Sequence, residues 1–179
     1  MGLKDIDKKA AEKGKAVETF WQFIKFIVVS LGAFIIQTFL PLLIKLFMSD
    51  EFLHQEFEFL GIFKSSAEIG LGIFIAANLS NVIAQIVSFF INREKTFNSS
   101  ANIAVTLPIY IIFTIALICF SAWLSPTLIN FFSDKIGENA AISVSGAVCG
   151  AIQFFLYFPV DKLLFHKKKE DKEEAKASK

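Results

Sequence analysis

Four long apolar blocks constrain this chain more than any other feature of its sequence. They lie near residues 20–47, 69–92, 103–124 and 140–160. Each block is long enough to cross a hydrocarbon core of ~30 Å as a helix of about 20 residues. A helix pairs all backbone polar groups within the segment, as lipid requires, whereas a transmembrane β-barrel would show short alternating segments. The sequence therefore predicts an all-α, multi-pass membrane protein with four transmembrane helices.

The distribution of charge predicts how these helices are oriented. Lysines gather before the first block and after the fourth, Arg93 and Lys95 follow the second, and the other two connections hold mostly acids. By the positive-inside rule, both termini and the Arg93 connection are then cytoplasmic. We expect a cytoplasmic amphipathic segment over residues 1–19 that runs into the first span, a transmembrane domain over residues 20–165, and a charged cytoplasmic tail over residues 166–179.

The connections carry further signals. Residues 48–68 mix acids with several phenylalanines, so we expect a short helix or a re-entrant segment on the outer membrane surface. Pro41 is positioned to kink the first span. Pro126 closely follows the third block and predicts the end of that helix.

An internal repeat is visible in the second and fourth blocks. Residues 85–97 align with residues 153–165 without a gap, and Gln85 then matches Gln153 while Phe97 matches Phe165. The simplest architecture is two helical hairpins of the same orientation, as in transporters built from parallel repeats.

A stripe of polar residues runs along the second block. Its members share one helical face, because they recur three or four positions apart: Asn78, Asn81, Gln85, Ser88 and Asn92. Polar side chains are costly against lipid, so this face is expected to point inward. One interpretation is hydrogen bonding between helices, worth about 0.6 kcal/mol per pair. The other is a polar path for a lipid headgroup.

Arg93 is the only arginine in the chain. A guanidinium offers a planar fork of donors that pairs bidentately with phosphate. At a membrane boundary the nearest phosphates belong to lipids, so Arg93 is either a lipid-phosphate ligand or an ordinary interfacial anchor.

Two glycines of the fourth block, Gly146 and Gly150, form a GxxxG motif that permits close helix approach. We expect them to pack against the second span or against a second copy of the chain, which allows a homo-oligomer.

Several function classes find no support in the sequence. Its two histidines, His54 and His166, lie on opposite sides of the membrane in the predicted topology, so no catalytic triad can be assembled and we expect no enzyme. We find no metal-ligand or phosphate-loop motif, and expect no cofactor, no metal site and no nucleic-acid partner. No acid lies in the middle of a span, since Glu68 and Asp161 are at edges. We therefore expect no ion coupling, and this disfavours a small multidrug-type exporter.

Three segments of the chain resemble the GtrA-like family of small four-span membrane proteins. KFIVVSLGAFIIQ, residues 25–37, is similar to the family's opening. VSFFINREKTF, residues 87–97, resembles its strongest signature, an apolar helix that closes on Asn-Arg and then Thr-Phe. FPVDKLLF, residues 158–165, resembles its closing signature, with Asp-Lys where many members have Gln-Arg or Asn-Arg.

This resemblance implies movement of a polyprenyl-phosphate-linked monosaccharide across the bacterial plasma membrane, for glycosylation of cell-surface polysaccharide or teichoic acid, beside partner glycosyltransferases. A non-transporting scaffold for a glycosyltransferase is the alternative. The lipid phosphate is expected at Arg93, Lys95, Asn92, Lys25 and Lys162. The headgroup path is expected along Asn78, Asn81, Gln85, Ser88, Gln153 and Gln37.

Overall fold

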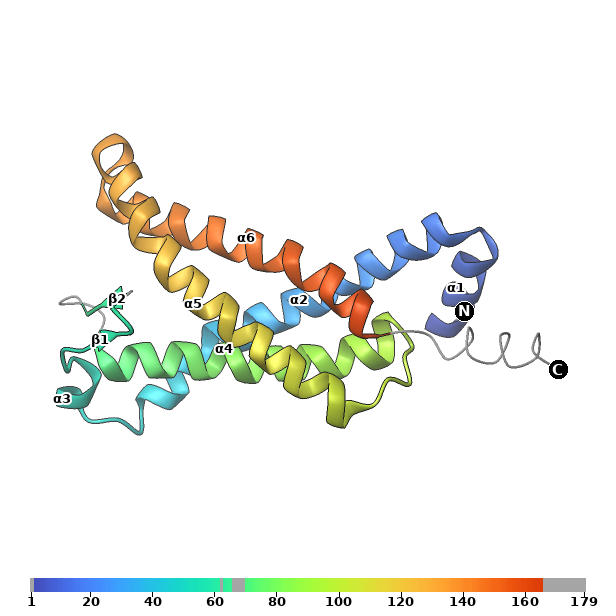
Figure 1. Ribbon diagram of the computed structural model, residues 1–179, viewed down its shortest axis with the longest axis horizontal. Coiled ribbons are helices and arrows are strands. Elements are labelled where there is room, and N and C mark those ends of the chain that lie inside the picture. The colour runs from blue at the N-terminus through green and yellow to red at the C-terminus, as the bar shows by residue number, and fades with distance from the viewer. Residues whose placement is uncertain (1, 62, 66–69, 166–179) are drawn as a thin grey trace.

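The computed structural model describes residues 2–61, 63–65 and 70–165, which are mostly helical (Figure 1). The helices are α1 (Leu3–Glu12), α2 (Lys15–Lys45), α3 (Asp50–Leu53), α4 (Leu71–Ile91), the π-helix η1 (Asn92–Thr96), α5 (Ile103–Ile136) and α6 (Glu138–Leu164). Two short strands, β1 (Glu58–Phe59) and β2 (Phe63–Lys64), pair antiparallel. Four helical segments in the described chain, in α2, α4 with η1, α5 and α6, are long and apolar enough to cross a membrane. The prediction of four spans in a multi-pass membrane protein is confirmed.

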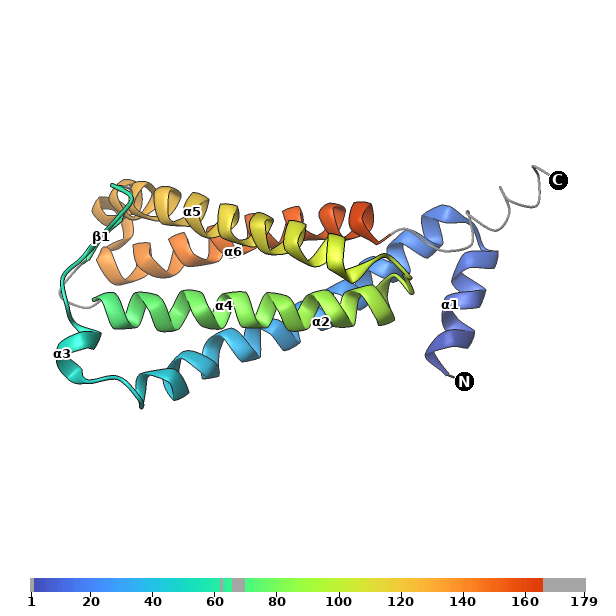
Figure 2. The same ribbon diagram turned by 60° about the horizontal axis from the view of Figure 1, so that its bottom comes forward.

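The four long helices form two packed pairs. α2 packs along α4, and α5 packs along α6, while α4 also contacts α5. Figures 1 and 2 show that η1, α1 and the last turns of α6 lie at one end of the bundle, here named the η1 end. The opposite end, the α3 end, holds α3, the β-hairpin and the turn between α5 and α6. The membrane orientation and the internal repeat stay predictions.

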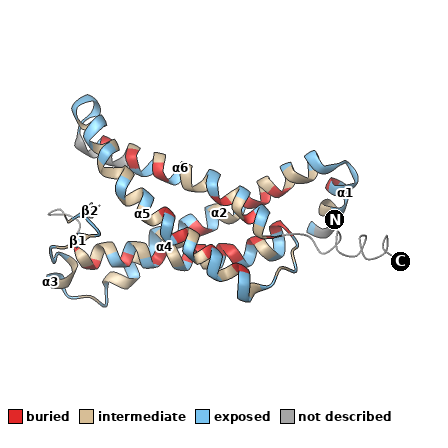
Figure 3. Ribbon diagram, in the orientation of Figure 1, coloured by how far each residue is buried: buried red, intermediate tan, exposed pale blue. Residues whose placement is uncertain are grey.

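Most residues of the four apolar spans face outward and not into the protein. Within the apolar stretches of the four spans, only 6% to 33% of residues are buried inside the protein. Figure 3 shows exposed and intermediate residues along the outer faces of α2, α5 and α6. Apolar side chains on these faces match a lipid surrounding.

The core is aromatic and sits toward the η1 end. Its buried members are Phe26, Phe89, Phe97, Tyr110, Leu117, Tyr157 and Phe165. The rings of Phe97 and Phe165, which the sequence alignment pairs, have their centroids 5.7 Å apart. This cluster joins all four long helices at one level.

Several predicted helix boundaries are wrong. The amphipathic N-terminal helix exists, but it does not run into the first span, because Gly14 adopts a φ of 108° and separates α1 from α2. α5 does not end before Pro126 but continues to Ile136. A proline inside a helix removes one backbone hydrogen bond, and the bonds on either side of it can persist.

The connection over residues 48–68 contains the predicted short helix, α3, followed by the β-hairpin. Glu68 and the predicted tail from His166 onward lie outside the described residues.

The GxxxG glycines do not make the predicted close contact with the second span. Gly146 and Gly150 are exposed, and a Cβ added to either would meet no described heavy atom within 4 Å. The close helix approach lies elsewhere, at Gly72, where an added Cβ would lie 2.8 Å from the Cα of Leu53. α3 therefore rests directly on the first turn of α4.

We expect Gly72→Ala to lower the free energy of unfolding by about 1–3 kcal/mol, because the new methyl group meets backbone atoms of α3 that cannot turn away. Gly146→Ala is the matched control and is expected to stabilise the protein by about 0.5–1 kcal/mol, since alanine favours the helix and has open space there. Thermal unfolding of both variants in the same detergent would test this. Equal losses would contradict the close approach of α3 to α4.

Candidate functional site: a polar pocket between the four long helices

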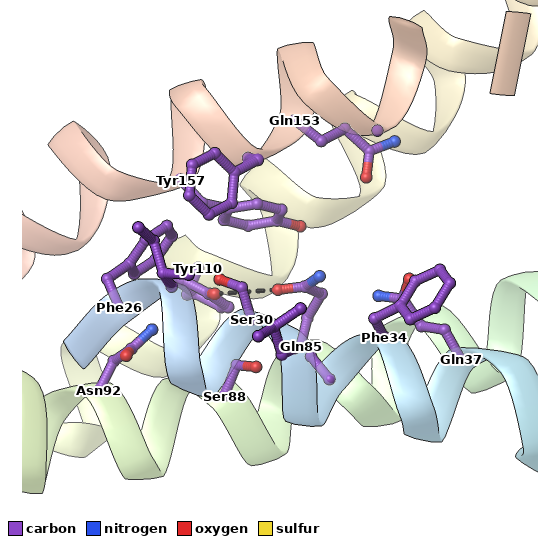
Figure 4. Close-up of a pocket in the computed structure, with 15 residues that line it drawn as sticks. Phe26, Ser30, Phe34, Gln37, Gln85, Ser88, Asn92, Tyr110, Gln153 and Tyr157 are labelled. Atoms are coloured by element: carbon purple, nitrogen blue, oxygen red, sulfur yellow. Dashed lines mark hydrogen bonds between the residues drawn. The ribbon is translucent and has the colours of Figure 1, made fainter. Parts of the chain in front are cut away.

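A pocket of about 280 Å³ lies between the four long helices (Figure 4). We name it the central pocket. Every long helix contributes a polar side chain to it: Ser30 and Gln37 from α2, Gln85 and Ser88 from α4, Asn92 from η1, Tyr110 from α5, and Gln153 and Tyr157 from α6. An inward polar face on several helices together requires a polar occupant or mutual hydrogen bonds.

Hydrogen bonds hold the polar groups of the central pocket in position. The Tyr110 hydroxyl donates to Oε1 of Gln85 at 3.2 Å, as the dashed line in Figure 4 marks. Tyr157 donates to the Thr114 hydroxyl at 2.9 Å, and the Gln153 amide donates to Ser121 at 2.8 Å. Inter-helix bonds of this kind fix the orientation of each amide. They position these side chains without filling the pocket.

Not every polar group of the pocket is used by the protein. The amide nitrogen of Gln85 and the hydroxyls of Ser30 and Ser88 make no hydrogen bond to another described residue, although all three residues line the space. These donors are available to a ligand with several hydroxyl or carbonyl oxygens.

The remaining wall of the central pocket is apolar and leads outward. Phe26 and Phe154 line its inner part. Leu31 and Phe34 also line it and are 59% and 64% exposed, so they form a rim on the surface of α2. Gly150, on α6, lines the pocket and is exposed as well. The pocket therefore opens sideways, on the outer surface between α2 and α6.

The predicted headgroup path is largely brought together. Gln37, Gln85, Ser88 and Gln153 line the central pocket, and Asn81 lies directly behind it as the acceptor of a 3.0 Å bond from Gln37. Asn78 does not line the pocket. Its amide donates to the carbonyl of Phe74, one turn earlier in the same helix, at 2.8 Å.

The predicted lipid-phosphate residues lie at the η1 end but do not converge on one point. Arg93 directs Nε and Nη2 to the carbonyl oxygen of Ala101, at 3.0 and 2.8 Å. Lys95 pairs with Glu94, and the Lys162 ammonium donates to Thr19 at 2.8 Å. The guanidinium fork of Arg93 thus makes hydrogen bonds within the protein, between η1 and the connection that enters α5.

Lys25, the most buried of these cations, holds α1 in place. Its ammonium donates to Oδ1 of Asp7 at 2.9 Å and to the carbonyl of Lys95 at 2.7 Å. The same Asp7 oxygen accepts from the indole nitrogen of Trp21 at 2.6 Å. Lys25 and Trp21 therefore form a small anion site at the η1 end, and Asp7 occupies it.

We expect Asp7→Asn to release α1 from α2, because the amide has no charge to offer Lys25 and the charge-assisted bond is the stronger kind. Amide hydrogen exchange over Leu3–Glu12 should become faster. Glu12→Gln is the control, since it removes the same charge from an exposed position of the same helix. If both variants exchange alike, the Asp7 contact does not hold α1.

Sequence reasoning missed the two tyrosines of the pocket. Tyr110 and Tyr157 are both buried, with ring centroids 5.4 Å apart. A usable signal existed, because the chain holds 22 phenylalanines and only these two tyrosines. A hydroxyl inside a hydrophobic span must find a partner, so each rare tyrosine marks a polar position.

Asp161 corrects another expectation. The sequence places it at the edge of a span, and the expectation of no ion coupling rests on that position. In the structure its side chain is 0% exposed and accepts a 2.7 Å hydrogen bond from Nδ2 of Asn92. Asn92, predicted as a phosphate ligand, also accepts from the Thr96 hydroxyl at 2.8 Å. A buried acid is therefore present near the end of α6, and the expectation of no ion coupling loses its ground.

The fold and the site define a class: a multi-pass membrane protein with four spans and a polar pocket that opens toward its lipid-facing side. No family model, no curated protein and no solved structure matches the chain.

Proposed function

We propose that this protein moves a polyprenyl-phosphate-linked monosaccharide across the plasma membrane of a bacterium. The observation that carries the proposal is the shape and chemistry of the central pocket, which has a polar interior and an apolar rim that opens sideways. An amphipathic ligand with one small polar headgroup and a long chain needs these two features together.

The size of the pocket supports a small headgroup. Its volume of about 280 Å³ is at the lower end of the ~300–1,000 Å³ typical of ligand pockets. The free donors of Gln85, Ser30 and Ser88 would bind sugar hydroxyls. The prenyl chain would leave over Leu31 and Phe34 into the surrounding lipid, so the protein would enclose only the sugar.

The phosphate would bind at the η1 end, which the proposal places on the cytoplasmic side. Lys25 already binds one anionic oxygen there, from Asp7. A lipid phosphate would replace the Asp7 carboxylate at Lys25 and Trp21, and Nη1 of Arg93, which makes no hydrogen bond to the described residues, offers a further donor. Anchoring elsewhere in the chain uses lysine, in keeping with a special role for this arginine.

A scaffold for a glycosyltransferase is the second candidate. One observation favours it: the guanidinium fork of Arg93 is satisfied inside the protein. Arg93→Lys would disturb the connection into α5 under either function, so it does not separate the two. A multidrug-type exporter loses the main ground against it, because Asp161 is buried. The several amide and hydroxyl groups of the pocket still favour a polar headgroup over an apolar drug.

Native mass spectrometry of the protein, gently extracted from its own membrane, would test the proposal directly. We expect a bound mass equal to polyprenyl phosphate plus one sugar, reduced in Gln85→Leu. Ordinary phospholipid alone, in equal amount in the wild type and the variant, would contradict the flippase and favour the scaffold.

A further inference from the structure

Asp161 stands on α6, three residues before the helix ends, in the layer behind the central pocket. Asn92 lies between Asp161 and the central pocket. It lines the pocket, and its amide nitrogen donates a hydrogen bond to Oδ2 of Asp161. The other carboxyl oxygen, Oδ1, is buried and has no hydrogen-bond partner among the described residues. A buried polar atom without a partner is rare enough in native proteins to require an explanation.

No described cation neutralises this carboxyl. On η1, Arg93 binds the carbonyl of Ala101, and Lys95 pairs with Glu94. On α2, Lys25 binds Asp7 and the carbonyl of Lys95. On α6 itself, Lys162 is exposed and binds Thr19. None of the ion pairs in the described part of the chain includes Asp161.

The other titratable groups near Asp161, within the part of the chain that the structure describes, are phenols. Tyr110 on α5 and Tyr157 on α6 lie within electrostatic range of the carboxyl, and both donate their hydroxyl hydrogens to other residues. The aromatic cluster closes over the same region, and the ring of Phe165, four residues after Asp161, packs on Phe89 at 5.1 Å. Among the described residues, these surroundings supply no positive charge to an ionised carboxylate, and Asp161 itself is fully buried.

An ionised carboxylate in such a place would be strongly unfavourable, and a buried acid avoids this by holding its proton. We propose that Asp161 is a proton-binding site that links the packing of α6 against η1 to pH on that side of the membrane. With the proton bound, the neutral acid stays in the packed interface and keeps its bond to Asn92. When the carboxyl releases the proton to water, the carboxylate requires hydration, and the end of α6 separates from η1.

This link has a defined sign. The packed arrangement binds one proton more than the separated one, so its stability falls as pH rises. Because Asn92 belongs to both the pocket and the Asp161 pair, separation of α6 from η1 would also change the pocket wall. A proton gradient could then drive the movement of the headgroup. Only this last step rests on the proposed function.

Infrared spectroscopy of the protein in lipid vesicles, with isotope-labelled aspartate, would test the proton site. We expect the isotope-shifted carbonyl band of a protonated aspartic acid at neutral pH. The band should be lost in Asp161→Asn, and in Asp161→Glu it should appear without the isotope shift, because glutamate is not labelled. Asp134→Asn, the same change at an exposed position of α5, should retain the band. The wild-type spectrum decides even if the variants fail to fold: no protonated aspartate at neutral pH would overturn the proposal.

Amide hydrogen exchange would test the link to packing. After correction for the intrinsic effect of pH, protection of residues 158–165 should fall as pH rises in the wild type and stay constant in Asp161→Asn. A wild type without this pH dependence would overturn the coupling. Neither measurement involves transport, so a failure of the flippase proposal would leave both results standing.

Discussion

Gln85→Leu is expected to lower the rate of headgroup translocation about tenfold, the effect of losing roughly 1.4 kcal/mol of binding free energy. The substitution nearly conserves volume but removes both polar atoms of the amide. The Tyr110 hydroxyl loses its acceptor, and the ligand loses the free amide nitrogen. The measurement is the rate at which a polyprenyl-phosphate hexose becomes accessible on the far side of proteoliposomes that contain the purified protein.

Asn78→Leu provides the comparison. It makes the same kind of change in the same helix, two turns earlier, where the amide is bonded among the described residues only to the carbonyl of Phe74. We expect a rate close to that of the wild type. If Asn78→Leu is as slow as Gln85→Leu, the whole polar stripe forms the path, as the sequence alone suggested. If neither changes the rate, the central pocket is not the route.

Asn92→Leu is expected to lower the free energy of unfolding by about 1–3 kcal/mol, the usual cost of leaving a buried partner unsatisfied. Asn92 donates to Asp161 and accepts from Thr96, and all three side chains are buried. Leucine has the same branching as asparagine but leaves the Asp161 carboxyl without its described donor. Chemical or thermal unfolding in lipid nanodiscs would measure the loss.

The double variant Asn92→Leu/Asp161→Leu tests whether the pair is the cause. We expect it to recover part of the lost stability, because neither buried partner is then left unsatisfied. A double-mutant cycle with Asp161→Leu alone then gives the coupling between the two side chains. Additive losses would show that Asn92 and Asp161 act independently, which would contradict the pairing seen between η1 and α6.

The four spans were predictable because length and hydropathy alone decide whether a segment can cross a membrane. The ends of the helices were harder to predict from the sequence. Pro126 is a common stop signal, but α5 continues past it, because a single proline removes only one backbone hydrogen bond of a helix. At Gly14 the chain breaks where the charge pattern predicts one continuous helix, because Gly14 adopts a positive φ.

The pocket was predictable in outline through the helical spacing of its amides. Spacing gives the shared face of one helix, and this placed Gln85 and Ser88 correctly. Spacing gives no account of which neighbour each side chain meets. The spacing therefore predicted Asn92 as a phosphate ligand, whereas its side chain binds Asp161. The guanidinium fork of Arg93 likewise binds a backbone carbonyl of its own chain.

The contact between α2 and α6 has a mechanical consequence. These helices touch mainly through the rings of Phe23, Phe26, Phe154 and Phe158, in tilted and edge-to-face pairs with centroids 5.0 to 5.9 Å apart. Aromatic pairs of this kind tolerate a range of tilted and edge-to-face geometries. The cluster can therefore serve as a fulcrum: tilting one helix pair about it would widen the gap on one side of the rings while narrowing it on the other.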